Sequence, residues 1–265
     1  MPSVSNVAVG ALVAGAAASK ARHGMNESIA RLSTGMRSMY GGDAAGQSVA
    51  NTLEARSKSW AVAARNAEDG ISAAQTAESA LLEIAALAQR LRELGIQADN
   101  GALLSTTSDV AAMDAEAAAL FDAIDAIVSK ATFNGVSLIS TGPVELSIGV
   151  TDDGGAVTLT TAETITSVAT YGSAANADTT ADTTLQEVAL SLGNVAAGIA
   201  ALKGRQAVAY SASANLAAAA SRIEDTDFAK ESANLAKYSV LNQSAMAMVA
   251  QANQAQSAIL TILQQ

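Results

Sequence analysis

The sequence predicts a mainly α-helical fold, in which long antiparallel coiled-coil helices from both chain ends flank a small β-hairpin region in the middle. Half of the 265 residues are hydrophobic but only 3% are aromatic, which favours long Ala-rich helices over a globular core. The two prolines, Pro2 and Pro143, leave the chain between them free to be helical. Apolar residues also recur in alternating steps of three and four, the spacing of a coiled-coil seam.

Three helices are expected in the first half of the chain. The first carries a short heptad over residues 25–36, and the second begins at Asp43, which serves as its N-cap, and continues to about Asp99. The third follows Ser108, again as N-cap, and keeps an unbroken three-four alternation to Ile127. Because the intervening loop, residues 98–107, contains an Asn-Gly pair, the second and third helices should fold back as an antiparallel pair.

The middle of the chain changes from helical periodicity to alternation. Apolar residues alternate with polar ones from Val144 to Val150, two Asp and two Gly follow at 152–155, and the alternation resumes at Val157 and Leu159. This pattern predicts a β-hairpin near residues 144–160. The Thr/Ala/Ser-rich residues 160–184 are expected to be loop, and a long helix is expected to start at Leu185 and continue to about Ile223.

Both chain ends are uncharged helices. Residues 1–19 and 238–265 contain no Asp, Glu, Lys, Arg or His. Asn and Gln side chains interrupt the second stretch too often for a membrane span, and no Lys or Arg precedes the apolar run of the first, as a signal peptide requires. We therefore expect no membrane insertion and a self-assembly seam on the last helix, formed by Leu241, Ala245, Met248, Ala252, Ile259 and Ile262.

Composition excludes several classes of function. A formal charge of −10 without a basic stripe argues against a nucleic-acid partner. The chain has no Cys, and His23 is its only histidine, so thiolate or His-based metal sites and catalytic triads cannot be built. We also find no nucleotide loop or nucleophile–base pair. The protein is therefore expected not to be an enzyme, with no catalytic, cofactor-binding or metal site.

Several linked motifs, in the right order, resemble bacterial flagellin, and the likeness covers roughly residues 1–160 and 185–265. They are residues 30–37 (ARLSTGMR), 43–47 (DAAGQ), 65–72 (RNAEDGIS), 75–78 (QTAE), 133–135 (FNG), 221–228 (SRIEDTDF) and 250–254 (AQANQ). The chain is short for that family, and its middle leaves no room for the large variable outer domains of many flagellins.

The resemblance implies a structural subunit that polymerises into the helical filament of the bacterial flagellum, for motility. It implies an inner assembly domain of terminal helices, residues 1–42 and 225–265, and a helical middle domain, residues 43–224. It further implies an extracellular location reached by export without a cleaved signal peptide. The implied partners are further copies of the chain, an export chaperone, and the flagellar cap and hook-junction proteins.

One further segment, residues 89–94 (QRLREL), looks like the part of many flagellins that the Toll-like flagellin receptor of animals recognises. The resemblance implies receptor contacts at Arg90, Leu94 and Glu116, whose charged members could equally make salt bridges and subunit contacts. Gly95 follows, where a bulkier helix former is common, and should weaken the helix by roughly 1 kcal/mol relative to Ala.

Two other classes of protein remain open from the sequence. A flagellar hook-filament junction protein has similar terminal helices, and a signalling coiled coil is also Ala-rich and Cys-free. The expected hairpin between the helices argues against the signalling coiled coil.

Overall fold

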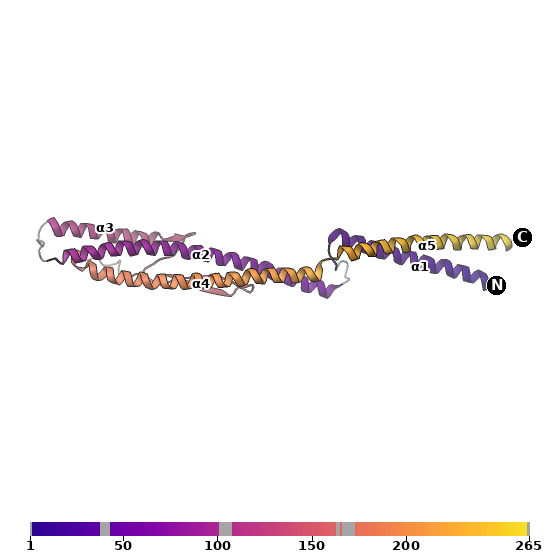
Figure 1. Cartoon of the computed structure of the whole chain (residues 1–265), viewed down its shortest axis with the longest axis horizontal. Coiled ribbons are helices and arrows are strands. Elements are labelled where there is room, and N and C mark those ends of the chain that lie inside the picture. Colours follow the sequence, from indigo (N-terminus) through magenta and orange to yellow (C-terminus); the bar gives the residue numbers. More distant parts are fainter. Residues whose placement is uncertain (1, 38–42, 101–107, 163–164, 166–172, 264–265) are drawn as a thin grey trace. The chain divides into compact units, whose positions relative to one another are not determined.

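The computed structural model describes residues 2–37, 43–100, 108–162, 165 and 173–263, which form five long helices and two short antiparallel strand pairs (Figure 1). The elements, in order, are α1 (Pro2–Thr34), α2 (Ala44–Ala98), α3 (Ser108–Lys130), β1 (Thr132–Phe133), β2 (Val136–Ser137), β3 (Val144–Gly149), β4 (Ala156–Ala162), the 3-10 turn η2 (Ala174–Asn176), α4 (Ala177–Glu224) and α5 (Phe228–Leu263). The expected fold class, helices from both ends with a hairpin in the middle, is confirmed.

The chain divides into two compact units. The terminal unit comprises Met1–Glu54 and Ala217–Gln265, and the middle unit comprises Ala55–Leu216. Compactness therefore assigns the start of α2 and the end of α4 to the terminal unit, whereas the sequence had placed both in the middle domain. In the terminal unit, α1 and α5 pack along each other.

Local hydrogen bonds explain where the helices of the terminal unit begin and end. The backbone N–H of Gly46 donates to Asp43 Oδ1 at 2.8 Å, so the expected N-cap of α2 is present. Asp227 caps α5 in the same way, because its carboxylate accepts from the N–H groups of Ala229 and Lys230. Helix α1 ends at Gly35, whose φ of +74° is one that a side chain would disfavour.

The core of the middle unit lies where α2, α3, α4 and the β3–β4 hairpin meet. Its largest fully buried side chains include Leu81, Ile84, Ile124, Leu138, Leu159 and Leu202. Farther along α2, Leu91 and Leu94 pack in a second cluster with Met113 and Ala117 of α3. Since rising positions on α2 meet falling positions on α3, the two helices are antiparallel, as the sequence predicted. The loop expected to join them lies mostly outside the described residues.

The hairpin is present, but α4 starts earlier than the sequence indicated. Residues Ala177–Thr184, expected to be loop, are helical, and β4 continues to Ala162. The reason is a stripe of small residues: Ala174, Ala177 and Ala181 are buried against α2 and α3 and continue the seam of α4 towards its N-terminus. The expectation of a loop was wrong because Thr and Asp predominate around these alanines and the first large apolar residue of the helical spacing is Leu185.

Gly95 has a different role from the one expected. A Cβ atom added there would lie 2.3 Å from the backbone N of Asp178, in the first turn of α4. Real Cβ atoms essentially never approach a backbone atom so closely. The missing side chain therefore lets the start of α4 pack directly on α2, a benefit that offsets the poor helix propensity of glycine.

One described helical stretch, Ala174–Glu224, is long and apolar enough, by length and composition alone, to cross a membrane. This stretch lies outside the uncharged chain termini, where the sequence had raised the possibility of a span. Core helices pass the same test, and Val188, Val195 and Leu202 of this stretch belong to the core of the middle unit. The expectation that no part of the chain inserts into a membrane stays a prediction.

Candidate assembly surface

The antiparallel pair of α1 and α5 has a specific register set by close packing. A Cβ atom at Gly24 would lie 2.6 Å from ring atoms of Tyr238, so only glycine admits this ring at its present position. Arg22 Nη2 donates to Met246 Sδ at 3.3 Å, and Arg31 Nη1 lies 3.6 Å from Glu231 Oε1. These pairings could not be predicted from sequence patterns, because their members stand more than 190 positions apart.

The pair leaves much of its apolar surface uncovered. Within the uncharged stretches 1–19 and 238–265, Leu12 is 77% exposed, and six further large apolar side chains among the described residues are about half exposed or more. We call these seven residues the apolar strip: Val9, Leu12, Val13, Val240, Leu241, Met246 and Met248. The two stretches that carry the strip, residues 1–19 and 238–265, contain no charged residue of their own, although Arg22 contacts Met246 and two lysines line the hollow beside Leu241. Large exposed apolar patches of this kind mark interaction surfaces.

The expected seam of α5 lies along shallow hollows beside α1. Leu241 lines one hollow with Ala17 and Ala21, and Ala245 and Met248 line the next with Val9 and Val13. Ala252 lines a third hollow with Gly10. Only Ala245 is buried, whereas Leu241 and Met248 remain exposed. The side chains of Ile259 and Ile262, expected to extend the seam, lie outside the described residues.

The hollows exist because α1 presents small residues opposite the seam. Gly10, Ala14 and Ala17 supply little or no side chain, and a Cβ atom built on Gly10 would meet no atom within 4 Å. A coiled-coil seam is normally covered by side chains of the facing helix. Here α1 fills that role incompletely, so the seam offers space for side chains from elsewhere.

A polar cluster lies in the terminal unit where the end of α1 meets the start of α2 and the end of α4. The backbone N–H of Arg37 donates to the carbonyl oxygen of Glu224, the N–H of Thr226 donates to that of Gly35, and the Arg37 guanidinium contacts Asp43 at 2.8 Å. The Gly46 N–H and the Arg37 side chain lower the pKa of Asp43. These contacts, like the capping by Asp227, give the carboxylates of this region structural roles.

Glu231 is the buried carboxylate of the α1–α5 pair. The nearby Ser28 hydroxyl, then Asn234 and Arg31, lower the pKa of Glu231 against the opposing effect of burial. Ser28 Oγ and Glu231 Oε1 are both buried without a hydrogen bond of good geometry. The effect of Ser28 on this pKa is therefore that of a nearby hydroxyl dipole rather than of a formed bond.

The segment expected to contact the receptor, residues 89–94, contributes to an exposed ionic cluster on the middle unit. Arg90 donates to Glu116 Oε1 from Nη2 at 2.7 Å and from Nε at 3.0 Å, and Nη1 donates to Glu93 at 3.0 Å. The bonds to Glu116 and then Glu93 raise the pKa of Arg90. Leu94 does not lie on this surface: it is 1% exposed, packed in the core between α2 and α3. The expected apolar contact beside Arg90 is thus wrong for Leu94.

Comparison with known proteins identifies the family. The family model of the bacterial flagellin N-terminal helical region matches residues 6–142, and that of the bacterial flagellin C-terminal helical region matches residues 176–263. The chain belongs to the bacterial flagellin family. It is 32% identical to the flagellin of Bacillus subtilis (strain 168), over 88% of this chain and 90% of that protein. The chain is 34% identical to the flagellin of Halalkalibacterium halodurans, over 88% of this chain and 89% of that protein.

The family establishes the general function of the chain. It is a structural subunit of the bacterial flagellar filament, and no similarity reported above favours the hook-filament junction protein. The two family models leave residues 143–175 unmatched, a range that includes the β3–β4 hairpin. Among solved structures, a Bacillus cereus flagellin is 25% identical and covers 57% of this chain and 88% of that one, with a TM-score of 0.39.

Proposed function

We propose that the terminal unit is the part of the subunit that polymerises, and that further copies of the chain cover the apolar strip and the hollows along α5 in the filament. The observation that carries this proposal is the apolar strip itself, exposed on two helices whose outer ends have no charge. The seam of Leu241, Ala245, Met248 and Ala252, with Ile259 and Ile262 beyond, then becomes buried between subunits.

The free energy gained by burying the strip is of the same order as the entropic cost of association. Fully burying one Val, Leu or Met side chain is worth roughly 1.5–3 kcal/mol, so a strip of seven half-exposed side chains contributes on the order of 10 kcal/mol before the entropic cost of association. Small α1 residues opposite the seam allow a neighbouring helix to insert side chains without displacing α5. Assembly thus removes the cost of solvating these side chains.

Seeded elongation tests this proposal. Filament fragments are mixed with dispersed subunits, and filament length is followed by electron microscopy. Deletion of residues 245–265 should abolish elongation while the helices of the middle unit stay folded by circular dichroism, because that unit has its own core. Long filaments from the truncated chain would contradict the proposal.

A matched pair of point variants sharpens the test. Leu12→Asp places a charge at the most exposed position of the strip, whereas Leu12→Met keeps an apolar side chain of similar volume. We expect Leu12→Asp subunits not to elongate seeds and Leu12→Met subunits to elongate them as the wild type does. Equal elongation by both variants would show that the strip is not buried in the filament.

We also propose that the subunit is exported without a cleaved signal peptide, and that an export chaperone and the cap and hook-junction proteins bind the same terminal unit. The support for both parts of this proposal is the membership of the chain in the bacterial flagellin family. Tryptic peptides from filaments should then include the segment that ends at Lys20. If filament protein always starts within or after the apolar run, a segment is removed on export.

A second proposal concerns the ionic cluster of Arg90, Glu93 and Glu116. We propose that dispersed subunits are bound by the Toll-like flagellin receptor of animals through Arg90 and Glu116, and that filament packing hides this surface. The support is a half-exposed guanidinium held in a fixed orientation by two carboxylates, since Arg is enriched at binding hot spots. Leu94 would act only by positioning α2 against α3.

A further inference from the structure

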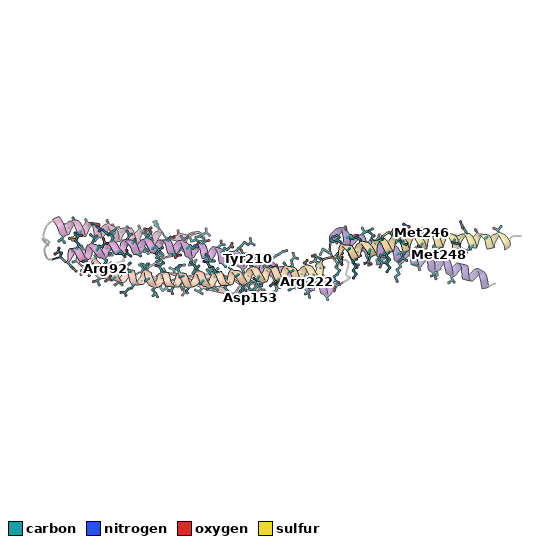
Figure 2. The ribbon with its side chains drawn as sticks, viewed as in Figure 1. Arg92, Asp153, Tyr210, Arg222, Met246 and Met248 are labelled. Carbon is teal, nitrogen blue, oxygen red and sulfur yellow. The ribbon has the colours of Figure 1, made fainter. Side chains whose placement is uncertain are left out.

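Methionine supplies all the sulfur of this chain, because it contains no cysteine. Met246 and Met248 of α5 are 48% and 61% exposed, whereas Met113 of the middle unit is 7% exposed. Figure 2 labels both exposed methionines on α5. A thioether reacts with peroxide in proportion to its access, so these two sulfurs are the most oxidisable among the described methionines.

We infer that Met248 is an oxidation site of the unpolymerised subunit, and that its oxidation blocks assembly. The inference rests on the proposed assembly role of the terminal unit. In the reaction, one oxygen of hydrogen peroxide bonds to Sδ of Met248 and the O–O bond breaks. The sulfur loses two electrons to give the sulfoxide, and the peroxide is reduced to water.

The surroundings of the two sulfurs predict opposite consequences. Met246 Sδ already accepts a hydrogen bond from Arg22 Nη2, and a sulfoxide oxygen there is a stronger acceptor for the same guanidinium. Met248 lines a hollow whose other side chains are apolar or absent: Val9, Gly10, Val13, Ala14, Ala17 and Ala245. Met248 also lines the adjoining hollow together with Gln251, whose side-chain amide is exposed to solvent.

Because of this difference, oxidation of Met248 controls whether the subunit can assemble. A sulfoxide at Met248 stays hydrated in the dispersed subunit, but a neighbouring copy that covers the apolar hollow would remove that water, and no side chain that lines this hollow can donate a hydrogen bond to the sulfoxide oxygen. Burial of an unsatisfied polar atom in this way weakens the binding of each added subunit to the filament by roughly tenfold or more. Once the subunit is in the filament, the same cover shields the sulfur from oxidant.

The experiment compares the full-length wild type with Met248→Leu and Met246→Leu. Dispersed subunits and finished filaments receive the same limited dose of hydrogen peroxide. Peptide mass spectrometry then locates the added oxygen, and seeded elongation gives the critical concentration. Leu is apolar, close in size to Met and a good helix former, and the elongation of each untreated variant is measured first, so that the effect of oxidation is expressed relative to that variant's own baseline.

We expect Met248 to be oxidised in dispersed subunits and protected in filaments, with Met113 unmodified in both. Oxidation should raise the critical concentration of the wild type and of Met246→Leu by roughly tenfold or more, and that of Met248→Leu by less than about twofold. Treatment with a methionine sulfoxide reductase should restore wild-type elongation, which excludes damage to other side chains.

The inference is overturned if Met248 resists oxidation in dispersed subunits, if oxidised wild type elongates normally, or if Met248→Leu is as sensitive as the wild type. Untreated subunits that fail to elongate would instead contradict the proposed assembly role. Should Met248→Leu assemble poorly before oxidation, Met248→Gln provides a second test. As an oxidant-independent polar replacement, it must elongate as poorly as oxidised wild type for the inference to stand.

Discussion

Replacing Gly95 by Ala tests the contact between α2 and α4 most directly. At an ordinary helical position this change would stabilise the protein by about 1 kcal/mol. Here the new methyl carbon would lie 2.3 Å from the backbone N of Asp178 and 2.9 Å from its Cα. The first turn of α4 must then shift by roughly 1 Å to reach van der Waals contact, an overpacking that costs about 1–3 kcal/mol. We expect a net loss of about 1 kcal/mol in the free energy of unfolding.

Gly204→Ala is the matched control for this prediction. Gly204 is an exposed position of α4, and a Cβ atom built there meets no atom within 4 Å. Its replacement should raise the free energy of unfolding by about 1 kcal/mol, the difference in helix propensity alone. Urea unfolding of the dispersed full chain, followed by far-ultraviolet circular dichroism, measures both variants on the same scale.

The sign of the Gly95→Ala change decides between two explanations of this glycine. Destabilisation by Gly95→Ala together with stabilisation by Gly204→Ala supports direct packing of α4 on α2. If both variants gain the same stability, the start of α4 does not lie against Gly95, and the early helix start seen here is refuted. A larger side chain, as in Gly95→Leu, should destabilise further, because it cannot fit without separating the helices.

Three further predictions concern the terminal helices and the ionic cluster. Amide exchange should be fast in α1 and α5 of dispersed subunits and slow in filaments, and strong protection of both helices in dilute subunits would refute this. Folding lowers the pKa of the Glu231 carboxyl, so its ionised form stabilises the folded protein fully above pH 4.5, the ordinary pKa of Glu, and this stabilisation is lost as the pH falls through the folded-state pKa. The stability of Glu231→Gln filaments should therefore depend less on pH in that acid range than the stability of wild-type filaments. An unchanged pH profile would contradict the role assigned to Glu231. Arg90→Ala should weaken binding of dispersed subunits to the Toll-like flagellin receptor by roughly tenfold or more, whereas equal binding by both proteins, or none, would leave Arg90 a structural role only.

Features that depend on neighbours within a few positions could be predicted from the amino-acid sequence. Asp43 identified the start of α2 because an N-cap bonds to a backbone N–H three residues on. The alternation from Val144 and the Asp-Gly turn placed the hairpin, and the three-four spacing placed α2 and α3. The flagellin motifs placed the whole chain in its family, since they recur in order along it.

The faces of those helices that become covered depend on packing between elements distant in the chain. Leu94 follows Arg90 by one turn, yet packing against α3 buries Leu94 and leaves Arg90 exposed. By sequence alone, Gly95 is a weak helix position, but in the fold it packs against Asp178. The small residues at the start of α4 were expected to form a loop, but in the fold they are buried. Each of these outcomes depends on a contact between residues far apart in the chain. Helical periodicity fixes which residues share a face, but the partner that covers the face is set by the fold.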